Sequence, residues 1–201
     1  AGVGLTYRGY GIADLCEHSC FEEVAFLLLY GHLPNAEELS SYRKKLKSMR
    51  SLPIALKEVL ERIPADAHPM DVLRTGCSLL GTLEPEGSDE RNQNDVADRL
   101  IATFPGMLVY WHKFHATSER ITEASEAEST AAHFLTLLHG KAPSEVHERA
   151  MDVSLILYAE HEFNASTFAA RITASTLSDF YSAITSAIGT LRGPLHGGAN
   201  E

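Results

Sequence analysis

Apolar residues recur at helical spacing through most of the 201-residue chain. One such stripe consists of Leu39, Tyr42, Leu46 and Met49. Side chains three or four positions apart lie on the same face of a helix, so this stripe predicts an amphipathic helix. Asn35 precedes the stripe and Glu38 follows it by three positions, which is the spacing of a capping box and marks where the helix begins.

The same periodicity continues along the chain. It predicts helices over 22–30, 53–63, 69–81, 95–115, 131–139, 145–165, 167–175 and 180–191. Polar stretches over 84–94 and 122–129 are expected to form loops. Residues 2–12 alternate glycine with apolar and β-forming residues, so they predict a short extended segment with turns. The chain therefore predicts a mainly α protein forming one domain over 1–201.

Composition and charge narrow the class of protein. Hydrophobic residues make up 44% and charged residues 22%, as in ordinary globular proteins. A net charge of −10 argues against nucleic acid or an anionic membrane surface as a partner. The apolar runs fall far short of the ~18 residues that a membrane span needs. Three cysteines cannot all pair within the chain, which indicates reduced thiols and a cytoplasmic protein.

The segment over 191–201 has the strongest chemical signal. His196 lies among Gly193, Gly197 and Gly198 at the end of an apolar helical run. Glycines without a Cβ let another molecule approach the backbone closely. This pattern makes His196 a candidate ligand-contacting residue.

A second candidate segment spans 158–167. It follows an apolar stretch without a turn signal, so His161 and Asn164 are expected on one helix face. Buried polar groups need partners, and this cluster therefore forms either an internal network or a ligand contact. The segment does not fit a zinc site of the protease type, which needs a second histidine four residues after the first, because that position after His161 is Ala165. No metal site is expected.

Five segments together resemble the citrate synthase family. They are Leu-Arg-Gly-Pro-Leu-His-Gly-Gly-Ala-Asn-Glu at 191–201, His-Glu-Phe-Asn-Ala-Ser-Thr at 161–167, Gly-Leu-Thr-Tyr-Arg-Gly-Tyr at 4–10, Tyr-Gly-His-Leu-Pro at 30–34 and His-Pro-Met-Asp-Val-Leu-Arg-Thr at 68–75. They occur in the family's order and extend over essentially the whole chain. Segments 68–75 and 158–167 are most similar to bacterial 2-methylcitrate synthases.

The resemblance implies both a fold and a reaction. Residues 1–201 would be most of the large helical domain of such an enzyme, with the small C-terminal domain lying beyond them. The reaction would be a Claisen-type condensation of propionyl-CoA with oxaloacetate, giving 2-methylcitrate and CoA in propionate catabolism. Two alternatives stay open. One is a citrate synthase that uses acetyl-CoA, and the other is a non-catalytic helical module.

The resemblance also implies roles for individual residues. His196 would be catalytic and donate a hydrogen bond to the thioester oxygen. His161 would contact oxaloacetate, and Asn164 would orient His161. Gly197 and Gly198, which lack side chains, would keep the wall beside the thioester low. The substrates would be oxaloacetate and acyl-CoA, with no permanently bound cofactor. The base and carboxylate-binding arginines would lie beyond residue 201, so this chain alone would be inactive. A homodimer is expected, with the helix over 181–189 at its interface.

Overall fold

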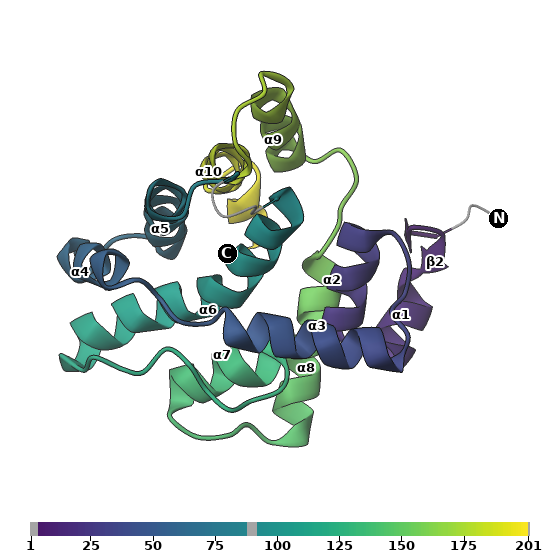
Figure 1. Ribbon diagram of the computed structural model, residues 1–201, viewed down its shortest axis with the longest axis horizontal. Coiled ribbons are helices and arrows are strands. Elements are labelled where there is room, and N and C mark those ends of the chain that lie inside the picture. Colours follow the sequence, from purple (N-terminus) through teal and green to yellow (C-terminus); the bar gives the residue numbers. More distant parts are fainter. Residues whose placement is uncertain (1–3, 88–91, 201) are drawn as a thin grey trace. The chain divides into compact units, whose positions relative to one another are not determined.

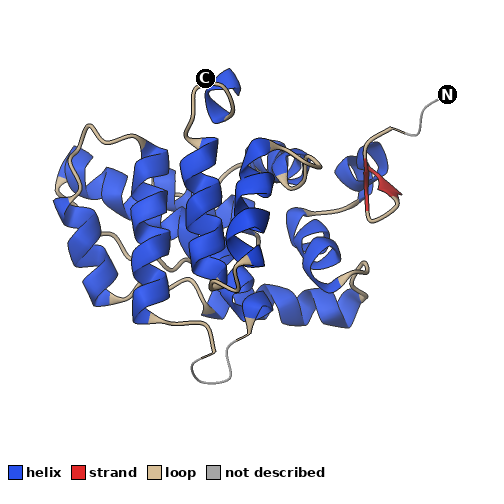
Figure 2. Ribbon diagram, turned by 90° about the horizontal axis from the view of Figure 1, so that it is seen from above, coloured by secondary structure: helices blue, strands red, loops and turns tan. Residues whose placement is uncertain are grey.

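The computed structural model describes residues 4–87 and 92–200. It divides into two compact units, Ala1–Met49 with Ala124–His161, and Arg50–Glu123 with Glu162–Glu201. Helices dominate the described residues, and a small antiparallel hairpin lies near the N-terminus (Figure 2). The predicted mainly α fold and the short extended opening are both confirmed.

The first unit combines the hairpin with helices from two separate parts of the chain. Its elements are β1 (Thr6–Tyr7), β2 (Tyr10–Gly11), α1 (Ile12–His18), α2 (Phe21–Tyr30), α3 (Ala36–Ser48), α7 (Thr130–His139) and α8 (Glu145–Tyr158). Arg8 and Gly9 both have positive φ, at 51° and 91°, and together turn β1 back onto β2. Such a two-residue turn matches the twist of a hairpin.

Apolar and polar contacts both hold this unit together. Its core contains Tyr7, whose hydroxyl donates a buried 2.9 Å hydrogen bond to the Ile156 carbonyl of α8. Glu22 is 1% exposed and accepts a 2.7 Å bond from the Thr130 amide. These bonds join segments more than a hundred positions apart, because buried polar groups must be paired inside the protein.

The second unit is a helical bundle. Its elements are α4 (Ile54–Arg62), α5 (Pro69–Leu83), α6 (Gln93–Thr117), α9 (Ala165–Ser175), α10 (Phe180–Leu191) and the 3-10 helix η2 (Gly197–Asn200). Figure 1 shows α10 between α5 and α9, and both helices contact it. Gly81 permits the close approach of α5 and α10, because a Cβ there would lie 2.7 Å from the Cβ of Tyr181.

A polar cluster lies at the end of α4 in this unit. Glu61 accepts bonds of 2.7 and 2.9 Å from the Arg120 guanidinium and one of 2.8 Å from the Tyr110 hydroxyl. The bonds from Arg120, with that from Tyr110, lower the pKa of Glu61 to about 2. Burial and the bond to Glu61 raise the pKa of Tyr110 to about 12. The carboxylate therefore stays ionised well into the acid range.

Most predicted helix bounds agree with the structure. The capping box of Asn35 and Glu38 is present, and Gly31 ends α2 in the left-handed conformation at φ 93°. Helix α6 runs without interruption through Pro105. Of the loop predicted over 84–94, residues 88–91 lie outside the described residues.

The helix predicted over 145–165 is wrong. Helix α8 ends at Tyr158, and a new helix, α9, starts at Ala165. Between them Glu162 adopts φ 57°, a left-handed conformation that breaks the helix. The segment contains neither glycine nor proline, so the one local signal of the break is Asn164, a residue type favoured at the N-cap.

None of the helices within residues 4–87 and 92–200 combines the length and the hydropathy that crossing a bilayer requires. Within the same residues, no three His, Cys, Asp or Glu side chains gather closely enough to hold a metal ion.

Candidate active site

The second unit brings His196 together with the start of α9. The His196 Nε2 atom lies 2.9 Å from the Ser166 hydroxyl and 3.3 Å from the Ser166 backbone nitrogen. Asn164 caps α9, and its Oδ1 accepts bonds from the Thr167 amide at 2.9 Å and from the Ser166 hydroxyl at 2.7 Å. Asn164, the cap of α9, is thus connected through Ser166 to His196, which follows α10.

The hydrogen bonds of His196 Nε2 depend on the tautomer of its ring. The Ser166 hydroxyl has one proton, which it donates to Asn164, so this hydroxyl accepts from an Nε2–H. An Nε2 without a proton instead accepts from the Ser166 backbone N–H, and the neutral ring then carries its proton on Nδ1. Among the described residues, Nδ1 has no hydrogen-bond partner, so in this second tautomer its N–H is available to donate to a ligand.

The backbone around His196 is tightly folded. After α10 ends at Leu191, the His196 amide donates to the Gly193 carbonyl at 3.0 Å, and η2 begins at Gly197. A Cβ on Gly197 would overlap the Leu191 carbonyl oxygen, so only glycine fits there. A Cβ on Gly198 would meet Pro194 at 3.6 Å, which is an ordinary contact. The fold therefore requires glycine at position 197 but leaves space for a Cβ at position 198.

His161 does not lie on a helix with Asn164, as the sequence pattern predicted. It is exposed, follows the end of α8 in the first unit, and its ring lies 6.0 Å from that of Tyr158. Asn164 belongs to the second unit and caps α9. The shared-face prediction is wrong because Glu162 interrupts the helix between them. The structure groups Asn164, Ser166 and His196, and places His161 outside that group's unit.

Sequence reasoning missed Ser166 as a partner of His196. It treated Ser166 as one polar residue within a continuous helix, whereas Ser166 lies in the first turn of α9. Asn164 is a favoured N-cap residue, and reading it as a cap would have placed Ser166 at the helix start. The pairing with His196, thirty positions away, has no sequence signal of its own.

A second contact supports the loop that carries His196. Arg192 follows α10, and its Nε lies 3.5 Å from Asp71 in the first turn of α5. Arg74 also pairs with Asp71, at 3.0 Å. The segment 68–75 therefore meets the segment 191–201, so two of the five recognised motifs are joined in space.

Comparison with known families identifies the class of this protein. The family model described as citrate synthase, C-terminal domain, matches residues 1–201. The chain belongs to the citrate synthase family, as its five motifs predicted.

Individual relatives narrow the comparison further. The chain is 64% identical to a 2-methylcitrate synthase of Shewanella oneidensis, over 100% of this chain and 53% of the relative. It is 45% identical to 2-methylcitrate synthase 1 of Corynebacterium glutamicum, over 98% of this chain and 53% of the relative. The chain thus spans about half the length of these curated relatives.

Solved structures confirm the citrate synthase fold. Citrate synthase from Thermotoga maritima matches with a TM-score of 0.85 and 35% identity, over 98% of this chain and 51% of that one. Citrate synthase from Thermoplasma acidophilum matches with a TM-score of 0.85 and 30% identity, over 95% of this chain and 50% of that one. The latter was solved as a ternary complex with carboxymethyl coenzyme A and oxaloacetate.

Proposed function

We propose that the protein containing this chain condenses propionyl-CoA with oxaloacetate to form 2-methylcitrate and CoA. The observation that carries this proposal is the placement of His196, whose Nε2 contacts Ser166 while Nδ1 has no hydrogen-bond partner among the described residues. The 64% identity to a 2-methylcitrate synthase supports the choice of acyl group. The substrate pair is consistent with the ligands bound to the Thermoplasma enzyme.

In the proposed reaction, His196 stabilises negative charge on the thioester oxygen. A base removes a proton from the carbon beside the thioester, and the C–H electrons delocalise onto the carbonyl oxygen. The His196 Nδ1–H donates a hydrogen bond to that oxygen, so a neutral imidazole suffices. The carbon then attacks the ketone carbon of oxaloacetate, forming a C–C bond while the ketone oxygen gains a proton. Water finally cleaves the acyl–sulfur bond and releases CoA.

The other predicted site residues receive supporting roles. Asn164 and Ser166 act as positioning residues, because Asn164 accepts from the Ser166 hydroxyl and Ser166 in turn contacts Nε2 of His196. We assign Gly197 and Gly198 to the wall beside the thioester, and the absence of a Cβ at Gly197 permits the close approach of the Leu191 backbone in the turn that carries His196. His161 is exposed, and we assign it to oxaloacetate binding. No permanently bound cofactor is part of this scheme.

Residues 1–201 are proposed to supply most of the large helical domain. The carbon base, the arginines for the substrate carboxylates and a smaller domain are assigned to the half of the relatives that this chain does not span. We accordingly expect a purified protein of these 201 residues to show no condensation. Turnover by that protein would refute this division of roles.

A homodimer is the proposed assembly. The outer face of α9 exposes Phe168 at 60% and Ile172 at 52%, four positions apart on one stripe. The helix over 181–189 stays the proposed interface helix, because it buries Tyr181 and Ile188 inside the second unit and leaves other residues partly exposed. The stripe on α9 is a second interface candidate. A monomer of the full-length protein in light scattering at micromolar concentration would contradict the proposal.

We also place the protein in the cytoplasm. Cys16, Cys20 and Cys77 are all free thiols, and Cys77 is buried. Burial raises the pKa of Cys77 to about 11, which keeps its thiol protonated and unreactive at neutral pH. Fractionation of cells that produce the protein would test this placement.

The test of the mechanism is His196→Ala in the full-length protein. Removing a hydrogen-bond donor to a developing oxyanion costs about 10²–10³ in kcat. The exposed His18 offers a matched control, and His18→Ala should keep wild-type turnover. Unchanged turnover in His196→Ala would remove this residue from the mechanism. Turnover with acetyl-CoA as the preferred substrate would favour the citrate synthase alternative.

A further inference from the structure

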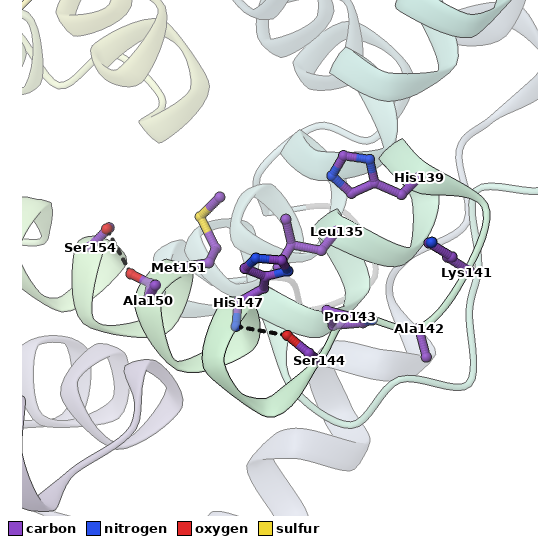
Figure 3. A pocket seen from close by; sticks show the side chains of 10 residues that line it. All are labelled: Leu135, His139, Lys141, Ala142, Pro143, Ser144, His147, Ala150, Met151 and Ser154. Atoms are coloured by element: carbon purple, nitrogen blue, oxygen red, sulfur yellow. Dashed lines mark hydrogen bonds between the residues drawn. The ribbon is translucent and has the colours of Figure 1, made fainter.

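The first unit contains a cavity that the proposed reaction does not use. It has a volume of about 860 Å³ and lies between the end of α7 and the outer face of α8 (Figure 3). Cavities that hold small molecules commonly have volumes of about 300–1,000 Å³. Its size is therefore sufficient for an organic ligand.

The floor of this cavity is apolar. Leu135 of α7 is buried and Met151 of α8 is half-buried, so both belong to the floor, and Ala142, Pro143 and Ala150 also line the cavity. Figure 3 shows Leu135 and Met151 facing the same hollow as the His147 ring. Methionine is flexible and polarizable, so it adapts to ligands of differing shape. The floor would favour an apolar or aromatic group.

The rim carries basic and hydrogen-bonding groups and no carboxylate. His139, Lys141 and His147 surround the floor, and none of the lining residues is Asp or Glu. Lys141 supplies a positive charge, and each imidazole offers an N–H donor in either tautomer.

The lining hydroxyls add acceptors and are fixed in place. Ser144 caps α8 by accepting a 3.3 Å bond from the His147 amide. Ser154 donates at 2.7 Å to the Ala150 carbonyl. These bonds hold both hydroxyls against the α8 backbone.

From this arrangement we infer a second binding site, for an organic anion that carries an apolar body. The anionic group lies at Lys141 and the two imidazoles, and the apolar body lies on Leu135 and Met151. The site belongs to the first unit, and its residues are distinct from Asn164, Ser166 and His196 of the second. The inference does not depend on the proposed condensation.

Three probes test separately whether the site recognises the anionic group and the apolar body of its ligand. Naphthalene-1-sulfonate has both an anion and an apolar body, 1-naphthalenemethanol has the body alone, and inorganic phosphate has the anion alone. Binding is followed in the full-length protein through the methyl signal of Met151, labelled with ¹³C and assigned by Met151→Leu. Met107 is fully buried in the second unit and serves as the internal reference.

The expected result is a saturable shift of the Met151 signal with the sulfonate, and a far weaker response to the other two probes. Lys141→Met should raise the Kd for the sulfonate by about 1.5- to 5-fold, the size expected for one exposed ion pair. Ala150→Glu places a carboxylate at the rim and should weaken binding more. Lys44→Met makes the same charge change on exposed α3 and should leave the Kd unaltered.

Several results would overturn the inference. Equal binding of the sulfonate and the neutral alcohol would show that no anion is recognised. Equal effects of Lys141→Met and Lys44→Met would show that only net charge matters. A Met151 signal that does not move would show that the cavity is not the site. Condensation kinetics play no part in these readouts, so the proposed reaction can fail while this site stands.

Discussion

Replacing Ser166 with alanine tests how His196 is held. The substitution removes the hydroxyl that lies 2.9 Å from Nε2 and 2.7 Å from Asn164 Oδ1. The backbone N–H of residue 166 remains, so the ring keeps one of its two contacts. Loss of one neutral hydrogen bond costs about 0.5–1.5 kcal/mol, which corresponds to about 2- to 13-fold in rate. We expect kcat to fall by this factor in the full-length protein.

A double-mutant cycle distinguishes this role from a general loss of stability. If Ser166 acts through His196, then Ser166→Ala should have no further effect on turnover once His196 is alanine. Ser175→Ala serves as the matched control, because Ser175 is also in α9 and its hydroxyl donates only to the Ile172 carbonyl. That variant should keep wild-type kcat.

The assay is steady-state release of CoA at saturating oxaloacetate, with thermal unfolding recorded for each variant. Fully additive effects of Ser166→Ala and His196→Ala would refute the positioning role. So would a loss of kcat in Ser175→Ala equal to that in Ser166→Ala.

Further predictions concern the cap, the glycine turn and the acid range. Asn164→Ala removes the α9 cap and should lower the free energy of unfolding by about 1 kcal/mol in denaturant titration. Gly197→Ala should lower Tm and turnover, because its Cβ would overlap backbone, whereas Gly198→Ala should change Tm little. Glu61 has a pKa lowered from 4.5 to about 2, so its stabilisation is present above 4.5 and disappears toward about 2. The Tm deficit of Glu61→Gln should therefore be full at neutral pH and vanish on acidification.

Much of the fold was predictable because local signals agreed with tertiary packing. Asn35 and Glu38 form the capping box that their spacing indicated, and Gly31 adopts the positive φ expected of a helix-ending glycine. Pro69 is the first residue of α5, as the sequence suggested. Each of these residues specifies its own backbone geometry, so no distant contact was needed to place it.

The site was less predictable because it depends on an irregular backbone and distant contacts. Glu162 takes a left-handed conformation that a residue with a Cβ rarely adopts, so its own identity did not indicate the break in the 145–165 helix. That break turns Asn164 from an interior helix residue into a cap. Ser166 then meets His196 across thirty positions, a contact that only the packing of α9 on α10 produces.

The central claim is tested most directly by the ratio of kcat/KM for propionyl-CoA to that for acetyl-CoA, measured with oxaloacetate and the full-length protein. One methylene changes discrimination by about 1–3 kcal/mol, so turnover with both substrates is expected. The proposed function predicts a ratio above one, with 2-methylcitrate as the identified product. No 2-methylcitrate from propionyl-CoA, or a ratio well below one, would contradict it.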